Sequence, residues 1–541
     1  MRNRTSRTVV AFAAGAALLL AAACGGGGED NESGGSSDAL VFGTSESFTG
    51  ADPAGDYSLP WSLILANTGQ NLLWIPPGGS QPEPQLAKQC DWEDEVTYTC
   101  TLKPDLKFSD GSDLTSEDVK FSMDRQVEMQ EPTGPWTLFK QVDEKSGDVT
   151  EGVESTEAPD PQTVTFNLAK PDATWPHRLT HAGASIVPKG EYSATEVRSK
   201  DFIGAGPYVV TKWQPSSQIV LEKNEHYTGD IEMKNDQVVI QKYKSEASLK
   251  NAVENGSVQV AYRTLTPTMV ADMEKNGADK GVEIVKGDGV GISYLVFNQN
   301  KGAFKDEAVR QAAAYLIDRE HIASDVYDDT VKPLYTMVPD IYEGSVPAFE
   351  ERYGSEPNPA EAKKVLKDAG IETPVKTTLY YNTDHYGETS ADMYVALEDQ
   401  LEAGGVFDIK LDTDAYDLYS EQYPTGAYEG FQLGWYPDFP DPDNYVQPFF
   451  ASGNFLGEGQ GYSNPEMDRM LGQERKIADD EEKRSDVFAE IQKLAAEEVP
   501  TLPIWQDEMI AAVREGVTGV EDTFDTAYTF RFWLVDVSEA Q

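Results

Sequence analysis

The stretch TYTCTLKPDLKFSDGSDLTSEDV, residues 97–119, carries signals for a strand, a turn and a helix in succession. Residues 97–102 alternate between apolar and polar side chains, which is the period of a strand with one buried face. The Asp-Gly pair at 110–111 is typical of a tight turn. Thr115, with an acid three residues later, is typical of a helix N-terminus with a capping box. The stretch therefore predicts a mixture of strands and helices, as in α/β or α+β proteins.

The same mixture continues outward from this stretch in both directions. Apolar and aromatic side chains predict further strands, and stripes of apolar side chains at helical spacing predict further helices. The predicted strands are 164–168, 208–213 and 291–298, and the predicted helices are 306–317 and 482–498. We find no internal repeat, so an α/β fold without repeated units is expected.

The first residues have the layout of a secretory signal, which is left out of fold reasoning. Three arginines precede an apolar run, and small residues lead to Cys24. We expect residues 1–23 to be a signal peptide and Cys24 to be acylated as in a bacterial lipoprotein, although the leucine lies one place earlier than in most such signals. Plain signal cleavage is the alternative. Residues 24–37 are rich in Gly, Ser and acids and are expected to form a flexible tether.

The chain is strongly acidic. Its formal net charge is −49, and removal of residues 1–23, with three arginines and no acid, would take it to −52 and leave 518 residues. Such a length is enough for two or three domains. A protein with this charge repels nucleic acids and anionic lipid headgroups, so we expect no nucleic-acid partner. The simplest interpretation of the acidity is a solvated, repulsive surface.

Two cysteines remain once Cys24 is assigned to the lipid. Cys90 and Cys100 bracket nine residues. Outside the cytoplasm the expected fate of such a pair is a disulfide, here across a hairpin. By the loop-entropy relation it would contribute about 3 kcal/mol to the free energy of unfolding.

A search for catalytic and metal-binding motifs finds none that is complete. There is no nucleophile elbow, no P-loop and no HExxH motif. The glycines at 287, 289 and 291 precede a predicted strand, whereas a dinucleotide-binding turn follows one. His177 and His181 are spaced for one helix face but stand alone, and residues 412–417 lack the Gly and Glu of a calcium loop. We therefore expect no enzyme activity, no cofactor and no metal site.

Five segments, taken together and in order, resemble the extracellular solute-binding proteins of the oligopeptide/dipeptide/nickel class. This is solute-binding protein family 5, whose members are the receptors of ABC importers. The segments are 98–119, 204–227, 297–320, 434–445 and 462–468, and the resemblance covers roughly residues 40–530 of the chain.

The resemblance implies a two-lobed, periplasmic-binding-protein type II-like fold with two crossing strands and an extra subdomain on the first lobe. Ligand would bind between the lobes and shift an equilibrium from open to closed, without covalent chemistry. The implied parts are 38–76, 185–287 and 508–541 for lobe I, 77–184 for the subdomain and 288–507 for lobe II.

The fourth segment is the one that the resemblance links to ligand. In peptide-binding relatives this stretch lines the cleft, and an acid after the Trp receives the α-ammonium group of the ligand. Asp438 is the matching residue, and a buried cation needs such a partner. Pro437 removes a backbone donor, and the crowded aromatic residues would equally suit a sugar. The implied ligand-binding residues are Gly434, Trp435, Tyr436, Asp438, Asn444 and Tyr445.

The function implied is an extracellular receptor that captures a short peptide and delivers it to the permease subunits of an ABC transporter. We find no convincing cation for a peptide carboxylate, so the length of the peptide stays open. One alternative is the same fold binding an oligosaccharide or a metal chelate. Another is a secreted hydrolase or a structural surface protein. We expect a monomer, lipid-anchored at the outer face of the cytoplasmic membrane or in the periplasm.

Overall fold

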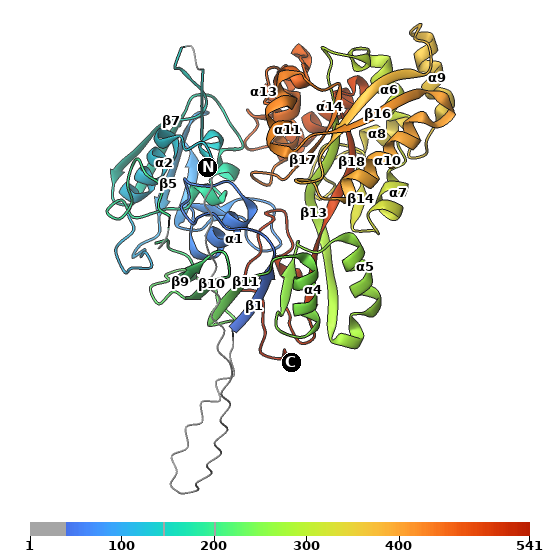
Figure 1. Cartoon of the computed structure of the whole chain (residues 1–541). Helices are drawn as coiled ribbons and strands as arrows, with labels where there is room; N and C mark the ends of the chain where they lie inside the picture. Colours follow the sequence, from blue (N-terminus) through green and yellow to red (C-terminus); the bar gives the residue numbers. More distant parts are fainter. Residues whose placement is uncertain (1–38, 144–145, 200–201, 541) are drawn as a thin grey trace, which may run out of the picture. The chain divides into compact units, whose positions relative to one another are not determined.

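The computed structural model describes residues 39–143, 146–199 and 202–540. Its central feature is an 11-stranded mixed sheet with the strand order β16-β15-β17-β13-β18-β12-β1-β11-β10-β9, in which β14 also pairs with β18 (Figure 1). The predicted signal peptide, tether and lipidated Cys24 lie outside the described residues. Within the described ranges, no helix is both long and apolar enough to cross a membrane.

The strands of the large sheet are β1 Ala39–Thr44, β9 Tyr208–Gln214, β10 Gln218–Lys223, β11 Gln237–Lys242, β12 Val260–Tyr262, β13 Val282–Phe297, β14 Val331–Pro333, β15 Val375–Tyr381, β16 Phe407–Thr413, β17 Gly430–Trp435 and β18 Thr501–Arg514. The remaining strands are β2 Leu73–Trp74, β3 Glu83–Pro84, β4 Ala87–Trp92, β5 Thr97–Leu102, β6 Lys140–Val142, β7 Val149–Asp160 and β8 Thr163–Leu168.

The α-helices are α1 Leu59–Thr68, α2 Ser116–Met129, α3 Trp175–Arg178, α4 Glu246–Glu254, α5 Pro267–Asn276, α6 Glu307–Ala314, α7 Arg319–His321, α8 Ala348–Tyr353, α9 Pro359–Asp368, α10 Thr389–Glu402, α11 Tyr416–Gln422, α12 Gln447–Phe450, α13 Pro465–Glu474 and α14 Glu481–Glu498.

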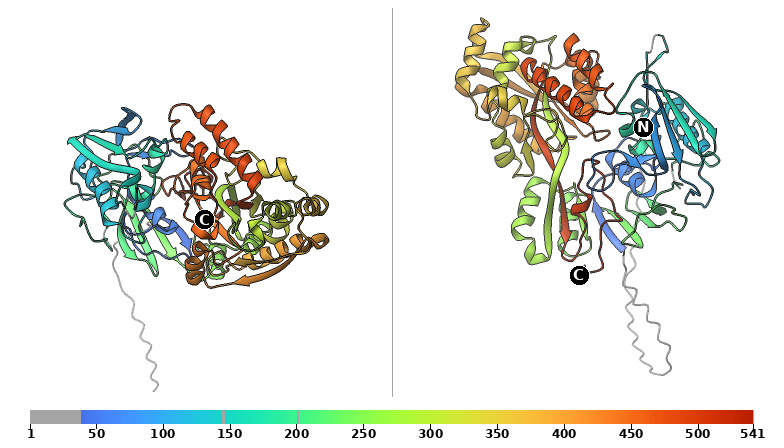
Figure 2. Two further views of the ribbon diagram at one scale, coloured as in Figure 1. Left: turned by 90° about the horizontal axis from the view of Figure 1, so that it is seen from above. Right: turned by 180° about the vertical axis from the view of Figure 1, so that it is seen from behind.

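Two long antiparallel strands, β13 and β18, are neighbours in this sheet and extend from one lobe to the other (Figure 2). Their pairing shifts register between Asp288 and Ile292, so the ladder is interrupted near its middle. At this interruption a Cβ on Gly289 would lie 2.0 Å from the carboxylate of Asp507, and one on Gly291 would lie 2.3 Å from the ring of Tyr436. The Gly-x-Gly-x-Gly pattern of the sequence therefore makes room for side chains at the crossing of the two strands.

Lobe I, as we use the name, contains β1, β9–β12, the first half of β13, the second half of β18, α1, α4 and α5. Here β1 pairs in parallel with β11 and β12. Leu40 and Phe42 of β1 belong to a core with the C-terminal residues Phe530 and Phe532. A second, smaller core beneath α4 and α5 includes Leu249.

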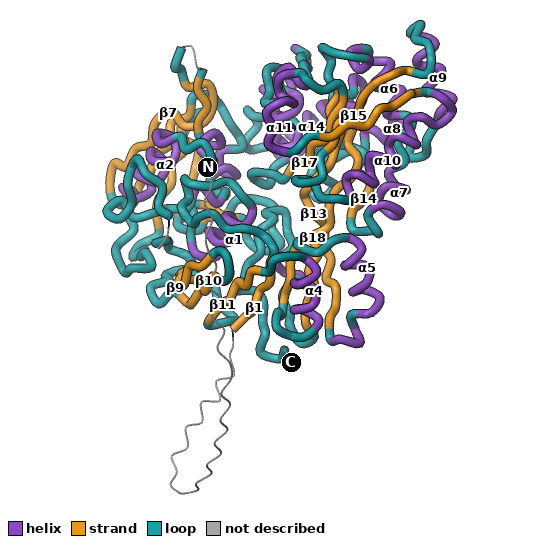
Figure 3. The backbone as a smooth tube through the Cα atoms, in the orientation of Figure 1, coloured by secondary structure: helices purple, strands orange, loops and turns teal. Residues whose placement is uncertain are grey.

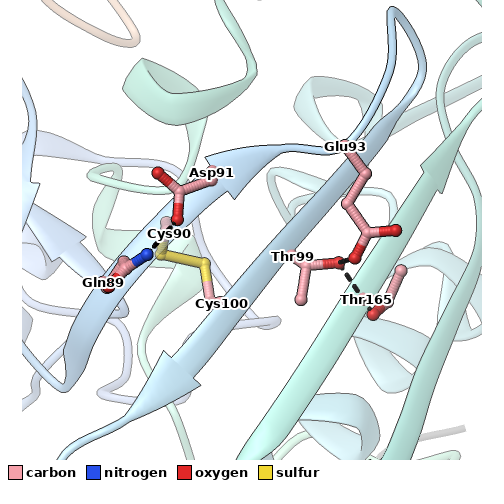
Figure 4. The surroundings of a disulfide bond; sticks show 7 residues. All are labelled: Gln89, Cys90, Asp91, Glu93, Thr99, Cys100 and Thr165. Atoms are coloured by element: carbon pink, nitrogen blue, oxygen red, sulfur yellow. Dashed lines mark hydrogen bonds between the residues drawn. A yellow bond between two sulfur atoms is a disulfide. The ribbon is translucent and has the colours of Figure 1, made fainter.

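The subdomain is a separate antiparallel sheet of order β4-β5-β8-β7-β6 with α2 packed on it. Its core includes Leu102, Phe108, Phe166 and Trp175. The predicted disulfide is present: Cys90 and Cys100 are directly opposite on β4 and β5, with 4.0 Å between their Cα atoms (Figure 4).

Lobe II contains β15–β17, the other halves of β13 and β18, and most of the remaining helices (Figure 3). Its sheet is buried on both faces. Leu295 and Phe297 of β13 face one core with α6, α9 and α10, whereas Ile292 and Tyr294 face the other with α13 and α14. Alternation along a strand sends neighbouring side chains to opposite faces. The apolar run in β13 therefore contributes side chains to both hydrophobic cores of lobe II.

Most local predictions agree with the structure. Residues 97–102 form β5, and α2 begins after Thr115, whose backbone N–H donates to the Asp118 carboxylate at 2.9 Å. The strand predicted at 291–298 is longer, because β13 begins at residue 282 in the other lobe. The helix predicted at 306–317 is shorter, since α6 ends at residue 314. The α/β fold with type II binding-protein architecture is confirmed by the comparisons below.

Candidate ligand-binding cleft

A cavity of about 330 Å³ lies where lobe I, the subdomain and lobe II meet. Its lining is rich in aromatic and amide side chains. The residues that matter below are Tyr57, Trp74, His181, Trp435, Tyr436, Asp438, Tyr528, Arg531 and Trp533. Residues of α1 and of the loop after β17 both line it. An apolar, aromatic pocket with a few polar groups is the usual form of a small-molecule site.

Asp438 is placed in this cavity by the loop that follows β17. Its carboxylate accepts a hydrogen bond from the hydroxyl of Tyr57, which belongs to lobe I. It also accepts one from Asn444 Nδ2 at 3.2 Å. Burial raises the pKa of Asp438, and the two hydrogen bonds and the nearby charge of Arg178 only partly offset this. Because no lysine or arginine among the described residues forms an ion pair with it, the carboxylate is suited to a cationic ligand group.

Asn444 holds the Asp438 loop rather than lining the cavity. Its Oδ1 accepts hydrogen bonds from the Asp438 backbone N–H at 2.8 Å and from the Trp435 indole N–H at 3.2 Å. The side chain is almost fully buried. Asn444 therefore orients two residues of the cavity lining but does not line the cavity itself.

Of the other predicted residues, some line the cavity and some lie outside its lining. Trp435 and Tyr436 line the cavity with Asp438. Gly434 lies on β17 opposite Ser293, and Tyr445 is fully buried with its hydroxyl donating to the Val290 carbonyl at 2.7 Å. The structure thus brings three of the six predicted residues to the cavity wall. Ligand contact by any of the six stays a prediction.

Most of the cavity lining comes from residues outside the predicted ligand-binding set. Tyr57, Trp74, His181 and Tyr528 line it from lobe I and the subdomain. None lies in a recognisable motif, and they are separated from Asp438 by up to 381 positions. Apart from the spacing of His181 from His177, only an aromatic residue near a loop marks each of them, which is too common a signal to select a binding residue.

His181 is a neutral hydrogen-bonding group in the cavity wall. Burial lowers its pKa to about 3. Its Nδ1 accepts the backbone N–H of Gly183 at 3.0 Å, so the ring proton is on Nε2. The rings of Tyr57 and Trp61 lie 5.5 and 5.9 Å from it. His181 can therefore donate one hydrogen bond to a ligand without adding charge.

Arg531 is the other charged residue of the lining, but its charge is already compensated. Its guanidinium pairs with the Asp525 carboxylate and donates to the Ile75 carbonyl at 2.9 Å. Both members of the pair are buried. Among the described lining residues, Asp438 is therefore the charged group without an ion-pair partner, although the charge of Arg178 acts on it from outside the lining.

Beside the cavity, a group of buried charges joins the subdomain to lobe II. Arg475 forms a two-pronged pair with Asp443, at 2.9 and 3.0 Å, and reaches Glu151 of β7 at 2.9 Å. The Arg475 carbonyl accepts the N–H of Ala173 at 2.8 Å. Across the same boundary His177 Nδ1 lies 3.6 Å from Asp441. Such contacts can exist only while the two parts are close together.

His177 and His181, which the sequence analysis singled out by their spacing, have separate surroundings: His177 lies near Asp441, and His181 lines the cavity. No metal-binding cluster is found among the described residues.

Two lobes joined by two long strands, with an interlobe cavity, define the chain as a binding protein of the type II class. A family model for bacterial extracellular solute-binding proteins, family 5, middle region, matches residues 81–457. The chain belongs to this family of ABC-importer receptors, as the five sequence segments predicted. Its curated relatives are solute-binding proteins, and the family description places such proteins outside the cytoplasm.

Curated relatives include the glutathione-binding protein GsiB. The chain is 25% identical to GsiB of Shigella dysenteriae and of Escherichia coli K12, over 450 residues that cover 81% of this chain and 83% of the relative.

Solved structures with the same fold include the ABC transporter substrate-binding protein CtaP of Listeria monocytogenes, with a TM-score of 0.78, 23% identity and coverage of 93% and 100% of the two chains. Another is the murein tripeptide-binding protein MppA of E. coli, with a TM-score of 0.74, 21% identity and coverage of 93% and 98%. A third is DppA of Helicobacter pylori in complex with the peptide STSA, with a TM-score of 0.73, 21% identity and coverage of 92% and 98%.

Proposed function

We propose that this protein captures short peptides in the interlobe cavity and delivers them to the permease of an ABC importer. The observation that carries the proposal is Asp438, a carboxylate in an aromatic cavity shared by both lobes that forms no ion pair among the described residues. A peptide α-ammonium group would supply the missing charge. Relatives named for glutathione, a murein tripeptide and the peptide STSA support a peptide-like ligand.

The aromatic walls suit a receptor that accepts many side chains. Tyr57, Trp74, Tyr436 and Trp533 offer flat apolar surfaces without a fixed polar pattern. His181 offers one neutral donor for a peptide carbonyl. The ammonium group would then fix the orientation of the peptide, and the side chains would contribute apolar contact.

The proposal is tested with a library of random di- to pentapeptides, half with a free N-terminus and half N-acetylated and isotope-labelled. Equilibrium dialysis followed by mass spectrometry gives the ratio of free to acetylated peptide retained. We expect wild type to prefer the free form about tenfold to a hundredfold, as for a hydrogen bond to a charged group. Asp438→Asn should bring the ratio close to one, because both changes remove the same pair.

Asp486→Asn is a suitable control, since this residue lies on α14 away from the cavity lining. Its ratio should equal that of wild type. If wild type retains no peptide, or if Asp438→Asn keeps the full preference, the ammonium role is wrong. Retention of an oligosaccharide or a metal chelate in place of peptide would favour the alternative ligands, for which Trp435 and Tyr436 supply stacking surfaces.

The receptor would consist of the parts 38–76, 185–287 and 508–541 for lobe I, 77–184 for the subdomain and 288–507 for lobe II. Separate hydrophobic cores support a division into three parts, and the subdomain core also takes in Leu72, Leu73, Ile186 and Ala205 from just outside 77–184. We further propose a monomer that binds no nucleic acid, contains no cofactor and catalyses no reaction. The strongly negative charge supports the exclusion of nucleic acids.

Anchoring by a lipid on Cys24 completes the proposal, since a receptor without an anchor would diffuse from its permease in a cell lacking an outer membrane. The signal-like residues 1–23 before this cysteine support it. Labelled palmitate should enter the wild-type protein and not Cys24→Ala, which should be released to the medium. Unlabelled wild type in the medium would refute the anchor while leaving the binding proposal intact.

A further inference from the structure

His177 lies at the boundary between the subdomain and lobe II. It belongs to the short helix α3 of the subdomain, and its side chain is 8% exposed. Its Nδ1 atom lies 3.6 Å from an Asp441 carboxylate oxygen of lobe II. His177 does not line the cavity, so the proposed capture of peptides gives it no part. A buried histidine at a boundary between two parts of the receptor is thus left without a role.

The Nδ1 atom of His177 is buried and has no hydrogen-bond partner among the described residues. The Asp441 carboxylate, at 3.6 Å, is beyond hydrogen-bonding distance. Buried polar atoms without a partner are uncommon in native proteins, because they lose their bonds to water and gain nothing in return. The closed boundary therefore holds this imidazole at a cost in free energy.

Asp441 is already satisfied inside lobe II. Arg484 donates to both of its carboxylate oxygens, at 2.6 and 2.8 Å, and the backbone N–H of Asp443 donates to its Oδ1 at 2.8 Å. Arg484 also pairs with Glu474 at 2.8 Å. A proton on His177 would therefore add a second positive charge beside a carboxylate that Arg484 already occupies.

The other acids whose charges act on the buried imidazole are paired as well. Asp172, on the loop before α3, pairs with Arg178 at 3.1 Å. Asp443 forms the two-pronged pair with Arg475, which also reaches Glu151 at 2.9 Å. Each of these acids thus already has an arginine partner, and a protonated imidazole would have to share one.

Burial is the main cause of the lowered pKa of His177. The charge of Arg484 lowers this pKa further, and the charges of Asp441, Asp172 and Asp443 offset the shift only in part. Movement of lobe II away from the subdomain would hydrate the imidazole and return its pKa toward about 6.5. The closed form therefore binds this proton less tightly than the open form, and closure weakens as the pH falls below about 6.5.

We propose that His177 is a pH-sensitive switch of closure: the neutral imidazole lets the subdomain lie against lobe II, and its protonation in mild acid favours the open form. Histidine is the side chain whose charge ordinarily changes in this pH range. The inference goes beyond the proposed function, since it concerns the motion of the receptor and not the identity of its ligand. Such a receptor would hold its ligand near neutral pH and release it more readily in acid.

The test counts closed molecules of the ligand-free chain by single-molecule fluorescence energy transfer. Bound ligand is removed by unfolding and refolding. Dyes are placed on Glu154→Cys of the subdomain and Lys367→Cys of lobe II, both exposed positions, in a Cys24→Ala background. An imidazole in the open form is about ten to one protonated at pH 5.5. We therefore expect the ratio of closed to open molecules to fall by up to about tenfold from pH 7.5 to pH 5.5.

His177→Gln, which is neutral at both pH values, should lose most of this fall. His321→Gln is the matched control. His321 also lies beside a carboxylate, with 2.6 Å between its Nδ1 and Asp325, but it is exposed on α7 and takes no part in the boundary. The control should keep the full fall of the parent chain.

The inference is overturned if the ratio stays constant in acid, or if His177→Gln keeps the full fall. It is also overturned if the ratio rises in acid, because protonated His177 would then pair with Asp441 and hold the two parts together. A fall in the parent chain that begins only below about pH 5, where carboxylates titrate, overturns it without any variant, even if His177→Gln does not fold. Because no peptide is present, these outcomes are independent of the peptide proposal.

Discussion

Arg475 of lobe II donates a hydrogen bond to Glu151 of the subdomain, with 2.9 Å between Nη1 and Oε2. Both side chains are mostly buried, at 12% and 22% exposure, and the same arginine is already paired with Asp443 of its own lobe. The pair with Asp443 lies within lobe II, whereas the contact with Glu151 requires the subdomain to lie against that lobe. The pair ties together two parts of the chain beside the cavity without contacting its lining.

Glu151→Gln should therefore shift the protein toward open forms. The loss of one charge-assisted hydrogen bond is expected to weaken peptide binding about tenfold or less. Small-angle X-ray scattering should show a larger radius of gyration, and calorimetry a weaker affinity with an unchanged preference for free amines. Glu154→Gln on the same strand, exposed to solvent, is the control. An unchanged radius and affinity in Glu151→Gln would show that this pair does not stabilise closure.

Peptide binding should weaken in acid if Asp438 holds an ammonium group. Burial raises the pKa of Asp438 in the free protein, and only the ionised carboxylate pairs with the cation. Affinity is therefore full above that raised pKa and falls as the pH drops through it, beginning at a higher pH than for an exposed aspartate. Titration calorimetry across pH 4–8 should show the fall for free peptides and not for N-acetylated ones. Identical pH profiles for wild type and Asp438→Asn would contradict the assignment.

Asp507 should make the folded protein less stable as the pH rises. Burial raises its pKa to about 6, above the value of about 4 expected for an unfolded chain. The folded state therefore holds this proton more tightly, and the contribution to stability is full below about pH 4 and lost as the pH rises through about 6. A pKa shift of this size corresponds to at most about 3 kcal/mol in the free energy of unfolding.

Asp507→Asn, which mimics the protonated acid, should remove this dependence. Melting temperatures at pH 4 and pH 7 provide the measurement, with the exposed Asp522→Asn as a control. The difference between the two temperatures should change in the first variant only. An equal change in both variants, or in neither, would mean that Asp507 does not titrate in this range.

The glycines at the strand crossing should tolerate no side chain. In Gly289→Ala the new Cβ would lie 2.0 Å from an Asp507 carboxylate oxygen and 2.4 Å from the Asp507 backbone oxygen. Relief of this overlap should cost about 1–3 kcal/mol of the free energy of unfolding. Denaturant unfolding gives the value.

Gly472→Ala on α13 is the matched control for this substitution, because nothing lies within 4 Å of its Cβ position. It should stabilise the protein by about 0.5–1 kcal/mol, as expected for alanine in a helix. Equal effects of the two substitutions would show that the strand crossing has room that the geometry does not indicate.

The disulfide should stabilise the subdomain. Cys90 and Cys100 close a loop with a sequence separation of 10, for which the loop-entropy relation gives about 3 kcal/mol. A double Cys→Ser variant should unfold at correspondingly lower denaturant concentration, whereas Cys24→Ala should unfold as wild type. Thiol labelling of denatured, non-reduced wild-type protein should find neither cysteine of the pair free.

The local elements were predictable because their signals act between neighbours along the chain. Alternation sets β5, and Thr115 with Asp118 sets the start of α2, whatever the rest of the protein does. The predicted boundaries were wrong where tertiary pairing extends an element. Strand β13 continues back to residue 282 because β18 offers a partner along its whole length. No local pattern in residues 282–290 predicts that this stretch pairs with β18.

The sequence by itself determined the family, the disulfide pair and the cavity residues at the end of β17, because each is encoded in short segments whose signals are local. Only the tertiary structure decided the rest of the cleft. Tyr57 meets Asp438 across 381 positions, and Arg263 meets Tyr436 from the other lobe. These contacts depend on how β13 and β18 cross and on how the lobes approach each other. Contacts of that kind leave no periodic trace in the sequence, since the residues that make them share neither an element nor a local neighbour.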